Sequence, residues 1–341
     1  MNDRTAEPAR RPGGNAREAT FAEQTERHRR ELRAHCYRML GSFDEAEDLV
    51  QETMLRAWRH RESYAGRSSL RTWLYTIATN ACLDQLRRRP RQPSAVVDRA
   101  GQPEFVEIGW LEPFPDSLAA GTPDPAAPLQ ERPDVAAVAT ETIELAFLIA
   151  VQQLPPRQRA VLILREVVDW SAADTATALD MTVAAVNSAQ QRAKATLREI
   201  ARRQDRETMR VPAASAAERE LVRRYVDAHA AGDPGAIVEL LREEVRIWMP
   251  PDPQFFLGRA AAADLFQELF VTTPVGEFRL LPAGRSNGHP AVANYLKRPG
   301  ETQFLAVALD VIRLVDGRID EIVVFEKRHF PRFGLPEVFP G

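Results

Sequence analysis

The sequence predicts a multidomain protein in which two all-α modules, joined by a flexible linker, precede an α+β domain. Apolar residues recur with helical spacing through residues 21–90 and again through residues 141–206, which is the pattern of amphipathic helices. Residues 91–140 between them carry eight prolines and more acidic than basic side chains, as linkers often do. After a second short linker, residues 207–215, the chain turns to aromatic residues and alternating apolar runs, which predict strands.

The composition of the 341-residue chain is typical of globular proteins, with 44% hydrophobic and 27% charged residues and a net charge of −3. No apolar run approaches the ~18 residues that a membrane span needs. Residues 1–20 lack the apolar core of a secretory signal, so we expect a disordered tail. Cys36 and Cys82 lack metal-type spacing, and we predict buried thiols in a reducing cytoplasm, with no metal site and no cofactor.

Two long helices are predicted in the first module. In the run from Asp44 to Trp58 apolar side chains share one face, and acidic residues crowd the first turn, where the helix dipole favours them. The run from Ser68 to Arg89 repeats the pattern, and Ser68 or Ser69 would cap it. Residues 21–90 contain 13 Arg and no Lys against 10 acidic residues, so this module is basic in a chain that is acidic as a whole.

The second of these helices has an unusual polar face, formed by Arg71, Thr72, Tyr75, Thr76, Thr79 and Asn80. A solvated face usually carries Glu and Lys, whereas hydroxyl, amide and aromatic side chains can hydrogen-bond to unpaired bases and stack on them. Two interpretations stay open on this pattern alone: a face for single-stranded nucleic acid, and an ordinary surface helix. The three arginines that end the helix either contact phosphates or favour the helix dipole.

A helix-turn-helix is predicted in the second module. One helix opens with prolines at Leu154–Arg159, a short helix follows Ser171, and Thr182 caps a longer helix after a tight turn. The second helix of such a motif normally enters the major groove, where Asn and Gln read adenine and Arg reads guanine. One face of the predicted longer helix carries Asn187, Gln191, Lys194 and Arg198. A plain three-helix bundle is the alternative.

Together the two modules resemble the extracytoplasmic-function (ECF) group of the sigma-70 family of RNA polymerase sigma factors. The first resembles sigma region 2 in the segments Asp44 to Thr53 and Tyr64 to Asn80, and the second resembles sigma region 4 in Leu154 to Arg159 and Val183 to Ala193. Three residues depart from the family's pattern: Asp180 stands where the turn often has Gly, Ala189 where Arg is common, and Gln190 where Leu is usual. The family's zinc-bearing anti-sigma motif is absent from this sequence.

This resemblance implies the partners and the residues that meet them. Core RNA polymerase, at its flap and at the clamp helices of its largest subunit, would be bound in part by Asp48, Leu49, Gln51 and Glu52. The open strand of the minus-ten promoter element would meet Tyr64, Gly66, Arg67, Ser68, Arg71, Thr72, Trp73, Tyr75, Thr76 and Asn80. The minus-thirty-five element would meet Thr182, Asn187, Ser188, Gln191 and Arg192. No bond in DNA is broken, so no catalytic residue is expected here, and the location implied is the cytoplasm, at the nucleoid.

The C-terminal residues 216–335 predict three helices on a curved antiparallel sheet, an α+β cone. This stretch resembles the SnoaL-like family, mainly through Gly258–Arg259 and the hairpin signal Asp316 to Ile319. Members hold small ligands or active sites inside the cone. The candidate pocket residues are Tyr225, Trp248, Asn294 and Asp310, although ordinary core positions explain Tyr225 and Trp248 better than a pocket does. We expect His229, His289 and His329 at the surface, and no acid–base pair is evident.

Three functions are compatible with these patterns. We favour a sigma factor whose C-terminal domain regulates the helical modules in cis, either by binding a small molecule or by gripping the linker. The alternatives are a SnoaL-type enzyme, a cyclase or hydrolase, fused to a helical DNA-binding part, and a ligand-responsive helix-turn-helix repressor. Copurification with core RNA polymerase separates the first from the second, and binding to duplex DNA without polymerase would mark the third.

Overall fold

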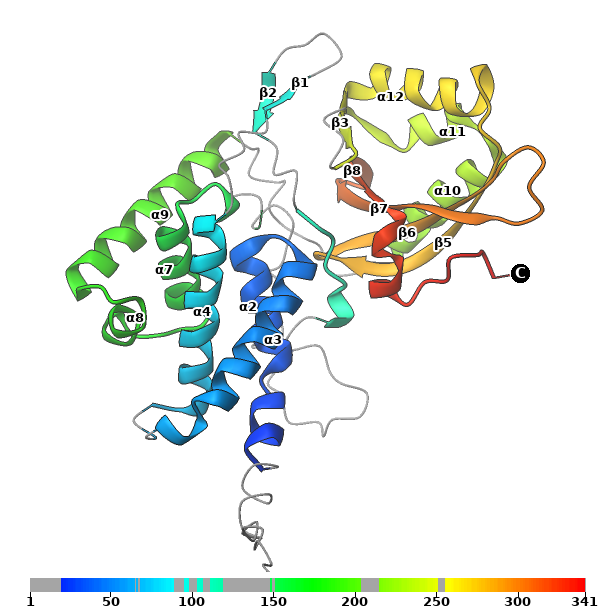
Figure 1. Ribbon diagram of the computed structural model, residues 1–341. Coiled ribbons are helices and arrows are strands. Elements are labelled where there is room, and N and C mark those ends of the chain that lie inside the picture. The colour runs from blue at the N-terminus through cyan, green and yellow to red at the C-terminus, as the bar shows by residue number, and fades with distance from the viewer. Residues whose placement is uncertain are drawn as a thin grey trace, which may run out of the picture.

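The computed structural model describes residues 20–64, 66, 68–88, 95–97, 103–106, 111–118, 148, 151–203, 215–250 and 255–340. Within these ranges a helical half lies beside an α+β half, which confirms the predicted fold class (Figure 1). No helix in the described part of the chain combines the length and apolar character needed to cross a membrane.

The first module consists of α2 (Arg29–Leu40), α3 (Phe43–Arg59) and α4 (Leu70–Arg88). Gly41 ends α2 with a left-handed φ of 74°, and Ser42 then caps α3 by accepting a hydrogen bond from the Glu45 amide. The Ser69 hydroxyl accepts from the Thr72 amide at the start of α4, as predicted. The three helices bury a common apolar core, so the two predicted helices are confirmed.

The second module consists of α7 (Pro156–Glu166), α8 (Ala172–Leu179) and α9 (Val183–Arg203). Ser171 caps α8 through the Asp174 amide, and Thr182 accepts a hydrogen bond from the Ala185 amide at the start of α9. Asp180 takes the left-handed conformation, with φ 51°, that the turn requires. Ala189 lies in the buried core, which explains why a small residue fits where the family often has Arg.

Six strands form the sheet of the C-terminal domain, in the order β4-β3-β8-β7-β6-β5. Their bounds are β3 (Leu241–Trp248), β4 (Phe255–Leu257), β5 (Glu277–Ser286), β6 (His289–Lys297), β7 (Leu305–Val315) and β8 (Arg318–Glu326). The expectation of a fully antiparallel sheet was wrong at one place, because β3 runs parallel to β8. These two strands are far apart in the sequence, with β4, α12 and β5–β7 between them, so no tight hairpin forces them to pair antiparallel.

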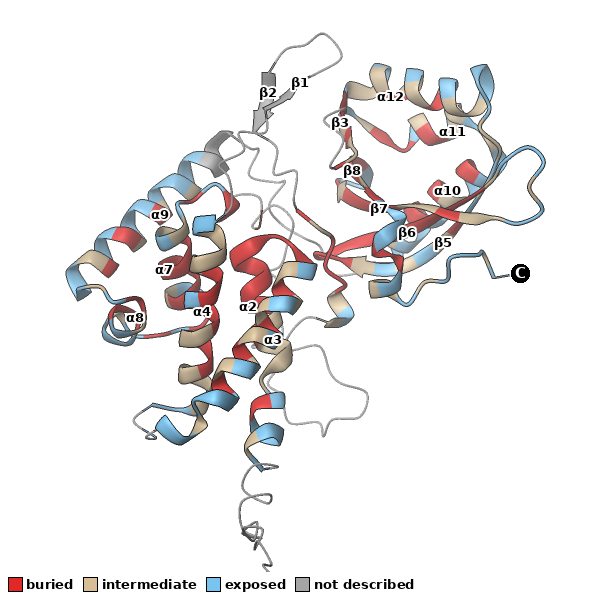
Figure 2. Cartoon of the chain, in the orientation of Figure 1, coloured by how far each residue is buried: buried red, intermediate tan, exposed pale blue. Residues whose placement is uncertain are grey.

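The two faces of this sheet have different neighbours. One face packs on α10 (Ala216–Ala231), α11 (Pro234–Glu239) and α12 (Gly258–Gln267), with residues such as Val292 and Ile312 in a core of their own. The opposite face, which includes Ala293 and Val311, joins the same buried cluster as the helical modules. Figure 2 shows this burial on both halves. The C-terminal domain therefore packs directly on the helical half and is not merely tethered to it.

Part of the linker departs from the flexible chain that we predicted. Residues 95–97 and 103–106 pair as a short antiparallel hairpin, β1 (Ala95–Val97) with β2 (Pro103–Val106). Residues 111–118, which we call the strap, run between the helical half and the C-terminal domain and end in the turn η2 (Asp116–Leu118). Leu111 and Phe114 of the strap are fully inside the shared core, at 2% and 0% exposure.

Candidate nucleic-acid interface

A hollow of about 330 Å³ opens on the first module, between α3 and α4. It contains three residues that were predicted to face the minus-ten strand, Trp73, Thr76 and Asn80. Sequence reasoning missed the rest of its lining, Arg56, His60, Ser63 and Ile77. Its volume lies at the lower end of the range of about 300–1,000 Å³ that small-molecule pockets occupy, so an unstacked base fits within it.

The loop before α4 supports this hollow. The Tyr64 ring stacks on Trp73 with centroids 5.0 Å apart, and its hydroxyl donates to the Ser68 carbonyl at 2.6 Å. Gly66 is exposed and has a φ of 66°, a conformation that favours glycine. The predicted contact Arg67 lies outside the described residues. A rigid aromatic pair beside an exposed loop is a surface on which a base can stack.

The prediction that Tyr75 faces the strand is wrong for this conformation, because the side chain is only 3% exposed. Its hydroxyl donates to Glu31 at 3.2 Å, and Glu31 also accepts from Arg71 at 2.7 Å. Its ring lies 6.2 Å from that of Trp170, which belongs to the second module. Burial raises the pKa of the Tyr75 phenol. The polar stripe read from the sequence is therefore too wide, since its inner edge packs on α2 and on the second module.

The recognition face of α9 is open to solvent. Asn187, Ser188, Gln191 and Arg192 are all exposed and, at this spacing, share one side of the helix. Thr182 caps the helix and so has a structural contact as well as its predicted role. Lys194, by contrast, pairs with Glu166 at 2.8 Å on the flank of the helix. The four exposed residues form a polar surface suited to base edges.

The predicted polymerase-binding residues lie along the outer side of α3. Asp48 and Gln51 are exposed and Leu49 is half-buried, while Glu52 pairs with Arg56 at 2.7 Å. Sequence reasoning missed a large apolar neighbour on this helix, Leu55, which is 51% exposed. Its position outside the apolar stripe was the signal that could have found it. The docked C-terminal domain leaves this side of α3 accessible.

The two helical modules contact each other directly. The Asn80 amide donates to the Ala178 carbonyl of α8 at 3.3 Å, so one residue of the hollow is already engaged by the second module. Gln152 donates to the Arg38 carbonyl at 3.0 Å, and the buried Arg159 guanidinium donates to the Met39 carbonyl. These contacts at the C-terminal end of α2 fix how the two helical modules lie against each other.

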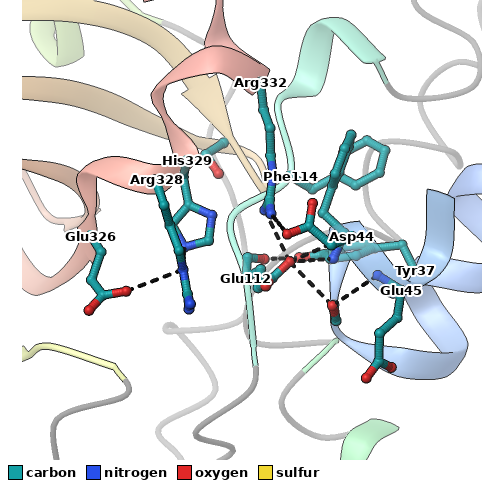
Figure 3. Close-up of polar contacts among 12 residues, drawn as sticks. Tyr37, Asp44, Glu45, Glu112, Phe114, Glu326, Arg328, His329 and Arg332 are labelled. Carbon is teal, nitrogen blue, oxygen red and sulfur yellow. Dashed lines mark hydrogen bonds and ion pairs between the residues drawn. The ribbon is translucent and has the colours of Figure 1, made fainter. Parts of the chain in front are cut away.

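The strap joins the first module through one carboxylate. Glu112, whose side chain is 13% exposed, accepts from the Phe43 amide at 2.8 Å and from the Asp44 amide and the Ser42 hydroxyl at 3.2 Å each (Figure 3). These donors are at the start of α3, where the helix dipole favours an anion. The Tyr37 hydroxyl donates to the Glu112 carbonyl at 2.6 Å.

The C-terminal domain holds the same strap from its other side. The Phe114 amide donates to Asn287 Oδ1 at 2.9 Å, and the Asn287 amide donates to the Phe114 carbonyl at 3.0 Å. Asp116 accepts from the Gly288 amide at 3.0 Å. Asn287 also donates to the Tyr37 hydroxyl at 2.9 Å. The turn between β5 and β6 therefore hydrogen-bonds to the strap and, through the same asparagine, to the first module.

One arginine closes this contact directly. Arg332, in the turn η5 (Lys327–Phe333), is 9% exposed, donates to Glu112 at 3.0 Å and pairs with Asp44 (Figure 3). Its guanidinium lies 4.9 Å from the Phe43 ring centroid, within cation–π range. Its neighbour Arg328 instead pairs with Glu326 at 3.2 Å on the exposed side of the turn. We call Arg332, Glu112 and Asp44 the latch.

The proposed ligand pocket of the C-terminal domain is only partly assembled. Tyr225 donates to Asp310 at 2.8 Å, and Asn294 hydrogen-bonds to the same carboxyl group, which burial brings to a pKa of about 6. Trp248 lies apart from these three residues, since it packs on the sheet face that joins the helical modules. Alternation along β3 places it there, opposite Ile247, which belongs to the core shared with α10, α11 and α12. No metal-type cluster of His, Cys, Asp or Glu occurs in the part of the chain that the structure describes.

The expectation of surface histidines was wrong, because His229, His289 and His329 are 5%, 4% and 1% exposed. Burial lowers the pKa of His229 to about 4 and those of His289 and His329 to about 3, with nearby arginines adding to the effect at the last two. His229 packs among aromatic rings, including Phe266. The prediction of buried cysteines is confirmed for Cys36 and Cys82.

Comparison with known proteins finds similarity along most of the chain. Family models match residues 25–92 (sigma-70 region 2), 145–197 (sigma-70, region 4) and 222–322 (SnoaL-like domain). The ECF RNA polymerase sigma factor SigG of Mycobacterium tuberculosis is 41% identical over 341 residues, covering 97% of this chain and 88% of SigG. The ECF RNA polymerase sigma factor SigW of Bacillus subtilis is 29% identical over 178 residues, covering 52% of this chain and 87% of SigW. The crystal structure of the M. tuberculosis extracytoplasmic function sigma factor SigJ has a similar fold, with a TM-score of 0.56 at 21% identity, over 94% of this chain and 99% of that chain.

Proposed function

The chain belongs to the ECF family of RNA polymerase sigma factors, and we propose that it binds core RNA polymerase through α3 and reads promoter DNA with both helical modules. The observation that carries this proposal is the presence of two different polar surfaces in one chain. The hollow beside Trp73 suits an unstacked base, and the face of α9 suits a duplex groove. A location in the cytoplasm, at the nucleoid, is part of the proposal.

Promoter opening is energetically feasible with such surfaces. Separating DNA costs about 1.4 kcal/mol per stacked step, and stacking an unpaired base on protein returns ~1–3 kcal/mol. Trp73, steadied by Tyr64, supplies the aromatic platform, and Thr76 and Asn80 supply hydrogen-bonding groups beside it. Binding upstream through α9 would hold the duplex while a base is captured.

The test is run-off transcription with purified core polymerase and selected promoters. Trp73→Ala should reduce open-complex formation while leaving duplex binding by α9 intact. Gln191→Ala should weaken duplex binding by α9 while leaving the opening of bound promoter intact. Trp58→Ala is the matched aromatic control for the first variant, because Trp58 is exposed but does not line the hollow. If the wild-type chain confers no start-site selectivity on any template, the proposed function is wrong.

We further propose that the C-terminal domain regulates these modules in cis by favouring a closed arrangement. Elements named for positions minus ten and minus thirty-five lie about 25 base pairs apart, or roughly 85 Å at 3.4 Å per base pair. In the closed arrangement α8 instead contacts α4, through Asn80 and Ala178. Reading both elements therefore requires the two modules to separate.

Two connections lead to the second module, and only the shorter one limits that separation. Residues 119–147 of the linker can extend far, because 29 residues reach up to ~100 Å. The connection from Arg203, the last residue of α9, to Ser215 before α10 is much shorter, and 12 residue steps span at most about 40 Å. While the strap and the latch keep the C-terminal domain on the first module, this shorter connection restrains the second module.

Two variants test this regulation in run-off transcription. Truncation at Ser215 removes the docked domain, and insertion of 20 Gly/Ser residues after Asp205 keeps the domain but relaxes the short connection. We expect both variants to depart from the full-length chain in the same direction if the restraint operates through the connection. A 20-residue insertion near residue 130 of the longer linker is the control. Identical activity of all four proteins under every condition would eliminate the cis regulation without touching the sigma function.

A further inference from the structure

A second hollow, of about 370 Å³, lies in the C-terminal domain where α10, α11 and α12 meet the turn between β7 and β8. Its lining is Leu221, Arg224, Glu239, Leu240, Arg259, Gly317 and Arg318. It unites the two short motifs that identified this domain in the sequence, Gly258–Arg259 and Asp316 to Ile319. Neither motif contributes to the sigma function or to the contact with the strap.

Two of its arginines are held in place by backbone carbonyls. Arg318 Nη1 donates to the Glu239 carbonyl at 2.8 Å and to the Leu241 carbonyl at 3.3 Å. Arg259 Nη2 donates to the same Leu241 carbonyl at 2.9 Å. A carbonyl orients a guanidinium but does not neutralise it, so two like charges are fixed beside one acceptor.

The hollow contains three arginines and one carboxylate, Glu239, so its charge is incompletely balanced. Arg259 pairs with Glu243 at 3.2 Å, but that carboxylate is 72% exposed, and exposed pairs are weak. Arg259 Nε is buried without a hydrogen-bond partner. Arg259 is also in the first turn of α12, where the helix dipole disfavours a cation and favours an anion. Arg224 is exposed and, among the described residues, forms no ion pair.

We propose that this hollow binds a small molecule through an anionic phosphate or carboxylate group. Guanidinium forks bind the oxygens of either group in pairs, and here three forks come from three different elements. The apolar side chains Leu221 and Leu240 provide a wall for the rest of the molecule.

The acidic surroundings favour a small ligand over a nucleic-acid backbone. An adjoining hollow of about 290 Å³ shares Arg224, Glu239 and Leu240 with the first and adds Asp227 and Asp233. Duplex DNA carries one negative charge per about 1.7 Å of its axis, so a backbone crossing the site would meet these carboxylates. A compact anion reaches the three arginines without crossing Asp227 and Asp233, and Glu239 is the one carboxylate that it meets in the hollow.

The experiment is calorimetric titration of the full-length protein, with pyrophosphate as the phosphate probe and succinate as the carboxylate probe. At least one probe should bind with a 1:1 stoichiometry. Arg224→Gln should weaken that binding at least tenfold, because Arg224 lines the hollow and its guanidinium forms no ion pair with another described residue. Arg223→Gln is the matched control, because Arg223 directly precedes Arg224 in α10 and is 61% exposed. It pairs with Glu220 and Asp227 outside the hollow, so the affinity of this variant should stay within twofold of wild type.

Three outcomes overturn the proposal. Neither probe saturates, or Arg224→Gln and Arg223→Gln bind equally, or non-promoter duplex DNA displaces the bound probe in an Arg224-dependent manner. The last result would assign the hollow to a DNA backbone instead. Because the assay measures binding alone, a failure here leaves the transcription results unaffected, and a failure of transcription leaves this proposal open to its own test.

Discussion

Replacing Arg332 with Gln should release the strap from the C-terminal domain. The substitution removes the cation of the latch and leaves Glu112, which is 13% exposed, with three hydrogen-bond donors but no opposite charge. Breaking a buried pair by removing one partner costs ~3–5 kcal/mol. The remaining donors lower this figure, and Asp44, at 67% exposure, adds less than ~1 kcal/mol. We therefore expect docking to weaken by about 2 kcal/mol, or roughly 30-fold.

Hydrogen exchange measures this directly. The Phe114 and Asn287 amides donate only across the contact between the strap and the C-terminal domain, so their exchange should accelerate about 30-fold when docking weakens by that amount. Arg328→Gln is the control, because Arg328 is in the same turn but forms an exposed pair with Glu326. Equal protection of the two amides in both variants would refute the reasoning about the latch.

Three further predictions concern other parts of the chain. Burial raises the pKa of Asp310 from 3.8 to about 6, so its protonated form favours the fold, and this stability is present below pH ~4 and lost as the pH rises to ~6. Urea denaturation of wild type and Asp310→Asn should show their free energies of unfolding diverging by ~3 kcal/mol across that interval, and a difference independent of pH would contradict this. Arg192→Gln should cost ~1–3 kcal/mol at a single base pair of the upstream element in binding assays, with little change on unrelated duplexes; a uniform loss would instead indicate a phosphate contact. Gly41→Ala should destabilise the fold by about 1–2 kcal/mol, since φ is 74° and the added Cβ would lie 3.3 Å from Gln152, whereas unchanged denaturation would show that the turn adapts.

The helices were predictable because their signals are local. Periodicity locates α3 and α4, the structure confirms the predicted caps Ser171 and Thr182, and it selects Ser69 from the two serines predicted for α4. The strap could not be predicted in this way, since Leu111 and Phe114 are separated by a proline and follow no period. Its order comes from partners about 70 and 170 residues away along the chain, which no local pattern reveals.

The candidate site was predictable to a similar extent. The exposed face of α9 follows from helix geometry alone, and Trp73, Thr76 and Asn80 do meet at one hollow. Tyr75 was misplaced because its burial depends on Glu31 and His35 of α2 and on Trp170 of the second module, which the pattern of its own helix does not reveal. The prediction that Trp248 lines the pocket of the C-terminal domain was wrong for a related reason. The sequence indicates a strand, but not which face of the strand turns toward the helices.

The carboxylate of Glu112 has a consequence for α3 itself. It acts as a second cap beside Ser42, taking two amides at the end of the helix whose outer side is proposed to meet polymerase. Losing a cap typically costs a helix about 1 kcal/mol. A change in the stability of the first turn of α3 must therefore change how tightly the strap is bound. By thermodynamic reciprocity, a change in the binding of the strap must change the stability of that turn by the same free energy. Binding of polymerase to α3 and binding of the strap to the first module would then be coupled through the single carboxylate of Glu112.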